Sequence, residues 1–198
     1  MLQIIILAAT ALLVGIDQLT KWLAVEYLQE GEPFPIIDGV FELLLHKNPG
    51  AAFGLFEGQR WLFMGITVVV IVVLAAILMS GKYRQYRLVN LSGTLIIAGG
   101  IGNMIDRVRL GHVIDFLYFR LIDFPIFNFA DCCVVIGALL LLIFFFFIYN
   151  EDKNGLDKKA GRRDKAALES AESAAAEETR DAGATDIGAG EGKDGPEA

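Results

Sequence analysis

The chain has 198 residues, 55% of them hydrophobic, and a mean hydropathy of +0.52, which is more apolar than soluble domains usually are and indicates a membrane protein. The formal net charge of −7 is uneven, because residues 1–150 carry 11 acidic and 9 basic side chains, whereas residues 151–198 carry 13 and 8. This balance offers no basic surface for nucleic acid and argues against nucleic-acid binding.

Four apolar segments are each close to the ~20 residues that cross a bilayer core as a helix. They cover residues 2–27, 61–80, 88–105 and 132–149. The first has no basic start and no clear cleavage site of small residues, so we expect a retained helix and not a signal peptide. The sequence therefore predicts an all-α membrane domain of four transmembrane helices over residues 1–150.

The segment between the first two spans, residues 28–60, is too apolar for a plain solvated loop. Short β-like stretches around Gly39 and a Gly/Pro turn at NPGAAFG (48–54) predict a small sheet at the membrane surface. The third span carries the small residues of AGGIGN (98–103), which let a neighbouring helix approach closely.

The composition changes after the last span. Residues 151–198 are rich in Ala, Gly and Glu and contain few large apolar side chains. Such a segment buries too little surface to offset the entropy lost on ordering. We therefore expect an acidic, disordered, cytoplasmic tail.

Basic residues predict the orientation of the spans. The short loop between the second and third spans carries Lys82, Arg84 and Arg87, and five more basic residues lie at positions 153–163, just after the fourth span. Cytoplasmic segments of membrane proteins are enriched in Lys and Arg. Both termini are then cytoplasmic, and residues 28–60 and 106–131 form the periplasmic segments.

Strongly polar residues gather on this periplasmic side. A charge at a membrane-spanning position is costly and is therefore a functional candidate. The group contains Asp17, Lys21, Asn48, Asn103, Asp106, Arg107, Asp115, Asn128 and Asp131.

Structural roles are the alternative for the charged residues on the helices. Asp17 and Lys21 are four residues apart, so they share a helical face and can pair. Asp106 and Arg107 stand together at a helix end, where an ion pair that stabilises the fold is the favoured interpretation.

The residues between the spans have structural alternatives as well. Asn48 and Asn128 can satisfy backbone groups at turns, and Asp131 can be the N-cap of the last helix. Asp115 is harder to explain in this way, because it lies between two apolar residues with no basic residue within two positions.

Two carboxylates beside apolar residues form a chemical pair, because like charges held close cannot both ionise easily. The ionised carboxylate can then take a proton from water while the protonated one polarises a carbonyl. Together these two steps allow hydrolysis of an amide bond. The chain has no H-E-x-x-H or G-x-S-x-G motif and only His46 and His112 as histidines, so we expect no metal and no cofactor.

Four motifs in this order resemble the lipoprotein signal peptidases, or signal peptidase II: DQLTK (17–21), NPGAAFG (48–54), GNMIDRVRLGHVIDF (102–116) and FNFADCCVVIG (127–137). The resemblance covers roughly residues 10–150. It implies a bacterial inner-membrane aspartyl endopeptidase that cleaves diacylglyceryl-modified prolipoproteins before the lipidated cysteine.

The same resemblance implies roles for individual residues. Asp115 and Asp131 match the catalytic pair. The positions implied to shape the site and to bind substrate or a globomycin-type antibiotic are Asp17, Lys21, Asn48, Gly50, Asn103, Asp106, Arg107 and Asn128. The expected partners are prolipoproteins, membrane lipid and such inhibitors.

Two functions of other classes compete with this one. A small transporter can use intramembrane carboxylates as a proton relay, but its acids should lie near the bilayer midplane and in both leaflets. A non-enzymatic assembly factor can use the polar residues to join helices, and its aspartates should then tolerate asparagine.

Overall fold

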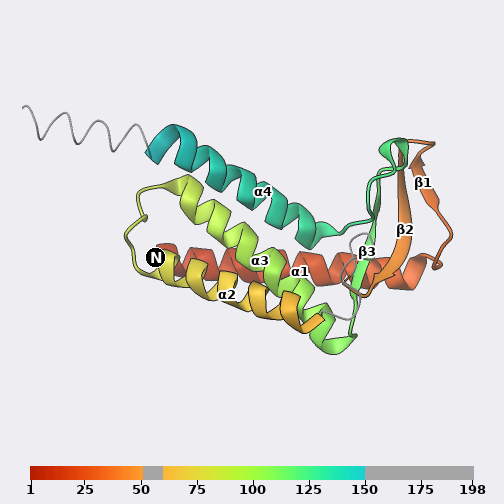
Figure 1. The fold of residues 1–198 in the computed structure, drawn as a ribbon, viewed down its shortest axis with the longest axis horizontal. Coiled ribbons are helices and arrows are strands. Elements are labelled where there is room, and N and C mark those ends of the chain that lie inside the picture. The colour runs from red at the N-terminus through yellow and green to blue at the C-terminus, as the bar shows by residue number, and fades with distance from the viewer. Residues whose placement is uncertain (51–59, 150–198) are drawn as a thin grey trace, which may run out of the picture. The chain divides into compact units, whose positions relative to one another are not determined.

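The computed structural model describes residues 1–50 and 60–149 (Figure 1). The chain divides into two units, Met1–Phe146 and Phe147–Ala198, and the fold described below is that of the first. The predicted tail over residues 151–198 and most of the predicted turn at NPGAAFG lie outside the described residues.

Four helices correspond to the four apolar segments. They are α1 (Leu2–Tyr27), α2 (Arg60–Met79), α3 (Arg87–Arg109) and α4 (Phe129–Ile143), and a π-helical stretch, η3 (Phe144–Tyr149), continues from α4. Among the described residues, Leu2–Tyr27, Arg87–Arg109 and Phe129–Tyr149 are long and apolar enough to cross a membrane, whereas the apolar part of α2, Met64–Met79, is shorter. The protein is therefore a helical membrane protein.

The third helix is central, because α1, α2 and α4 all pack against it. Small residues allow this close packing, as the sequence predicted. A Cβ added at Gly99 would overlap the carbonyl oxygen of Ala130, and one added at Gly137 would lie 2.9 Å from the carbonyl oxygen of Ser92. The helix backbones thus approach to distances at which only glycine fits.

A three-stranded antiparallel sheet lies across one end of the helices (Figure 1). Its strands are β1 (Phe34–Ile37), β2 (Phe41–Asn48) and β3 (Val113–Tyr118), and a short 3-10 helix, η2 (Arg120–Ile122), follows β3. The predicted sheet is confirmed, but its third strand comes from the segment between α3 and α4, where the sequence analysis expected none.

The sheet is joined to α1 by an apolar cluster of Ala24, Leu45, Ile114 and Phe116. This contact brings β3 to the ends of α1 and α3. At the opposite end of the bundle the start of α1 meets the end of α2, where Gln3 Nε2 donates to the carbonyl oxygen of Met79 at 3.3 Å. The two ends of the bundle therefore differ, and the predicted polar residues occupy the end that carries the sheet.

Candidate active site

Asn128 begins α4 and organises its first turn. Its side-chain oxygen accepts a hydrogen bond from the backbone N–H of Asp131 at 3.0 Å, and Asp131 Oδ2 accepts one from the backbone N–H of Asn128 at 3.1 Å. This reciprocal arrangement is a capping box. The alternative in which Asp131 is the N-cap is wrong, because Asn128 has the extended backbone of a cap and Asp131 lies three residues further on.

Asp115 lies on β3 and is buried, with only 2% of its surface exposed. Its Oδ1 accepts a hydrogen bond from Asn128 Nδ2 at 2.6 Å, and its Oδ2 accepts one from Asn48 Nδ2 at 2.9 Å. Asn128 therefore contacts both candidate carboxylates, and the arrangement combines residues of β2, β3 and the start of α4.

Asn48 is itself held at a turn. Its Oδ1 accepts a hydrogen bond from the backbone N–H of Gly50 at 2.9 Å. Gly50 has a φ of 104°, which side chains other than glycine rarely adopt. The prediction that Asn48 and Asn128 satisfy backbone groups is confirmed, and the same two side chains also donate to Asp115.

The environment of Asp115 favours its protonated form. Burial raises the pKa of Asp115 to about 6, and the nearby charge of Asp131 also acts to raise it. The hydrogen bonds from Asn48 and Asn128 act in the opposite direction. A carboxyl group with this pKa changes its protonation state close to neutral pH.

Asn103 connects Asp131 to a buried lysine. Its Nδ2 donates to Asp131 Oδ1 at 2.7 Å, and its Oδ1 accepts from Lys21 Nζ at 2.9 Å and from Asn128 Nδ2 at 3.1 Å. An ammonium group can only donate, so the amide oxygen of Asn103 must face Lys21. Its amide nitrogen must then face Asp131.

Lys21 is also the centre of a buried ion cluster, which we define as Asp17, Lys21 and Asp106. Lys21 Nζ lies 2.9 Å from Asp17 Oδ2 and 2.9 Å from Asp106 Oδ2, and all three side chains are buried. The predicted pair of Asp17 and Lys21 is confirmed. No ion pair between Asp106 and Arg107 occurs among the described residues, because Asp106 turns toward Lys21 instead.

The ion cluster also binds the backbone next to each aspartate. Asp17 Oδ1 accepts a hydrogen bond from the N–H of Ala130 at 3.0 Å, and Asp106 Oδ2 accepts one from the N–H of Ile114 at 3.2 Å. Ala130 and Ile114 directly precede the two candidate aspartates. The cluster therefore fixes the backbone from which both carboxyl groups extend.

Gln18 contacts both aspartates of the ion cluster and was missed by the sequence analysis. Its Nε2 lies 3.1 Å from Asp17 Oδ2 and 3.0 Å from Asp106 Oδ1. The sequence signal was its position beside Asp17 in the DQLTK motif, but an uncharged residue does not stand out in a search for costly charges.

Arg107 is half-buried on the last turns of α3. It donates to the carbonyl oxygen of Asn103 at 3.3 Å, and it is close enough to Asp131 and Asp115 to interact electrostatically with both. A fixed positive charge beside two carboxyl groups can orient an acidic or carbonyl oxygen. No three metal-ligating side chains come together in residues 1–50 and 60–149.

Comparison with known proteins identifies the family of this chain. A sequence model described as "Signal peptidase (SPase) II" matches residues 9–147. The chain belongs to the signal peptidase II family. The match covers all the residues of the site described above.

Individual relatives agree with this assignment. The lipoprotein signal peptidase of Brevibacillus brevis is 44% identical over 125 residues, which are 63% of this chain and 83% of that protein. That of Halothermothrix orenii is 48% identical over 120 residues, or 61% of this chain and 80% of the relative. A solved structure described as a bacterial membrane enzyme has a TM-score of 0.65 and 31% identity, and covers 72% of this chain and 93% of its own.

Proposed function

We propose that this signal peptidase is an aspartic endopeptidase in which Asp115 and Asp131 are the catalytic pair. The observation that carries the proposal is the double contact of Asn128, whose side chain donates to Asp115 while its backbone donates to Asp131. The two carboxyl groups thus share one partner and lie close to one another. The raised pKa of Asp115 agrees with a pair that holds one proton between its members.

The proposed reaction is direct attack by water. One carboxylate removes a proton from a water molecule as the oxygen attacks the peptide carbonyl, and the protonated partner donates to the carbonyl oxygen. The tetrahedral intermediate then breaks at its C–N bond, and the leaving amine takes a proton. Asn48, Asn103 and Asn128 keep the two carboxyl groups in position, because each donates a hydrogen bond to at least one of them.

The substrate class follows from the relatives, which are named lipoprotein signal peptidases. We infer that the substrates are prolipoproteins that carry a diacylglyceryl group, and that the cut precedes the lipidated cysteine. A site at the end of a membrane bundle suits this substrate, because its lipid chains stay in the bilayer while the peptide bond meets water and two carboxyl groups. Globomycin-type inhibitors would occupy the same site.

The remaining site residues support this reaction in the proposal. Asp17, Lys21 and Asp106 fix the backbone before each aspartate, Gly50 shapes the turn that holds Asn48, and Arg107 orients the substrate. All five lie at the sheet end of the bundle.

We further propose that α2 is a fourth span and that the protein lies in the bacterial inner membrane. Its 20 residues extend about 30 Å at ~1.5 Å per residue, which matches the hydrocarbon core. Four spans put both termini on the side of Lys82, Arg84 and Arg87, which is then cytoplasmic. The aspartates face the periplasm in this arrangement.

The test is release of the signal peptide from a diacylglyceryl-modified prolipoprotein by the purified enzyme in detergent. Asp115→Asn and Asp131→Asn should each bind the substrate and fail to cleave it. Asp38→Asn removes an exposed carboxylate from the turn between β1 and β2 and is the matched control, with turnover equal to wild type. Near-normal turnover by either active-site variant would remove that aspartate from the mechanism.

A further inference from the structure

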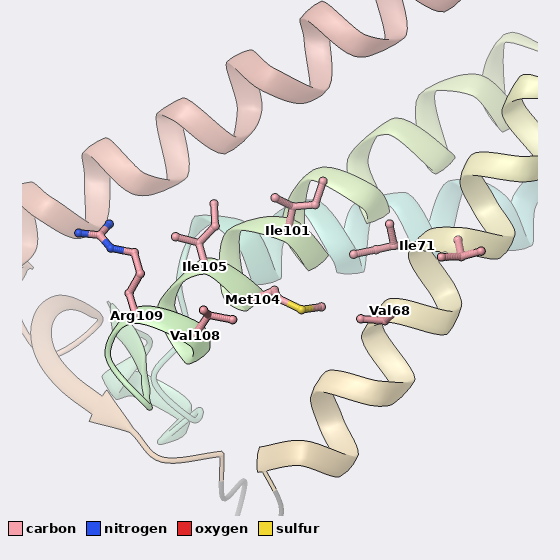
Figure 2. Close-up of a pocket in the computed structure, with 8 residues that line it drawn as sticks. Val68, Ile71, Ile101, Met104, Ile105, Val108 and Arg109 are labelled. Carbon is pink, nitrogen blue, oxygen red and sulfur yellow. The ribbon is translucent and has the colours of Figure 1, made fainter.

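A second feature lies between α2 and α3. It is an apolar groove of about 440 Å³, and its walls include Val68, Ile71 and Val72 of α2 and Ile101, Ile105 and Arg109 of α3 (Figure 2). The mechanism proposed above uses none of these residues. The volume falls in the range of sites that hold small molecules, which is ~300–1,000 Å³.

The groove is separate from the active site. Asn103 faces Asp131 from α3, and Ile101 and Ile105 lie two residues before and after it. Two residues correspond to a rotation of about 200° around an α-helix. The isoleucines therefore lie on the face of α3 opposite to Asn103.

The shape and chemistry of the walls favour a flexible acyl chain over another helix. Helices that pack together in membranes use small residues, as Gly99 and Gly102 do elsewhere on α3. The walls of the groove instead carry branched side chains such as Val68, Ile71 and Ile105 (Figure 2). A hydrocarbon chain can follow such a surface because it bends between the side chains.

Arg109 gives the groove a polar end. It lies in the last turn of α3, at the sheet end of the bundle, and its side chain is exposed. Within residues 1–50 and 60–149 it forms no ion pair and no side-chain hydrogen bond. A guanidinium group binds phosphate oxygens through two parallel N–H groups. None of the described residues that line the groove is a carboxylate, so they offer a lipid ammonium group no partner.

We propose that this groove binds one anionic phospholipid, with an acyl chain along Ile101 and Ile105 and the headgroup phosphate on Arg109. The net negative charge of the lipid complements the guanidinium group of Arg109, which has no ion pair within the described part of the chain. A zwitterionic lipid of the same chain length fits the channel equally but adds an ammonium group that the groove does not satisfy.

Native mass spectrometry of the full-length protein in detergent tests this directly. Phosphatidylglycerol and phosphatidylethanolamine with identical acyl chains are the two probes. Wild type should retain one phosphatidylglycerol and bind it more tightly than phosphatidylethanolamine. Arg109→Gln should weaken phosphatidylglycerol binding about tenfold and abolish the preference, because it removes a charge-assisted hydrogen-bonding group. Arg87→Gln, an exposed arginine at the other end of the same helix, should bind as wild type does.

A second variant tests the apolar part. Ile105→Trp fills the channel and should reduce binding of both lipids, with an unchanged circular dichroism spectrum as the check on folding. The proposal is overturned if Arg109→Gln keeps the wild-type preference, if wild type shows none, or if Ile105→Trp retains the lipid. It is also overturned if wild type is a dimer that Ile105→Trp dissociates, since a second copy would then occupy the groove. Mass readouts do not depend on cleavage, so these outcomes are independent of the proposed peptidase activity.

Discussion

Replacement of Lys21 by methionine tests the ion cluster most sharply. Methionine is close to lysine in length but removes the charge, and it leaves Asp17 and Asp106 without the ammonium that lies 2.9 Å from each. These carboxylates are 1% and 4% exposed, so water cannot replace the lost partner. Breaking a buried pair by removing one member costs about 3–5 kcal/mol of unfolding free energy. For a chain of this size that is a fall in Tm of roughly 6–20 °C.

Thermal unfolding of the purified protein in one detergent measures the effect. Lys47→Met is the matched control, because Lys47 pairs with Glu30 at the surface, where the two side chains are 48% and 53% exposed. Exposed pairs contribute little, so this variant should melt close to wild type. If Lys21→Met had the same melting temperature as Lys47→Met, the ion cluster would not be what holds the helices together.

Two further predictions concern a carboxyl group and a glycine. The pKa of Asp115 is about 6 in the folded protein against 3.8 ordinarily, so folding is disfavoured once this group ionises. The unfolding free energy of wild type should therefore fall by about 2 kcal/mol relative to Asp115→Asn as pH rises from 4 to 7. Parallel pH profiles in chemical unfolding would contradict it. Gly99→Ala should lower the free energy of unfolding by about 1–3 kcal/mol, because the added Cβ meets the backbone of Ala130. Gly65→Ala is the control and should not destabilise the protein, since nothing lies within 4 Å of a Cβ at that position. Equal melting temperatures of the two variants would contradict the close packing of α3 against α4.

Much of the helical architecture was predictable because a bilayer imposes a simple length and composition rule. The order of the spans then predicted that Asp17, Asp106 and Asp115 gather at one end. The small residues of α3 predicted close helix packing, because each close approach of two backbones requires glycine at a particular position.

Other features depend on contacts that local sequence does not encode. The sequence analysis predicted no strand around Asp115, because this segment becomes a strand only by pairing with β2, where His46 lies opposite Asp115. The partner of Asp106 was assigned to its sequence neighbour Arg107, whereas the actual partner, Lys21, comes from another helix. The relative rotation of α1 and α3 decides this pairing, and packing sets that rotation.

The hydrogen bond between Asp17 and Ala130 joins residues 113 positions apart. During synthesis α1 is made first and α4 last, so Asp17 has no backbone partner on α4 until the final helix arrives. Lys21 is available at once on the same helix and lowers the cost of holding this carboxylate in the membrane meanwhile. The proposed pair of Asp115 and Asp131 therefore reaches its final arrangement only when α4 has been inserted, because the contact between Asp17 and the backbone of Ala130 forms last.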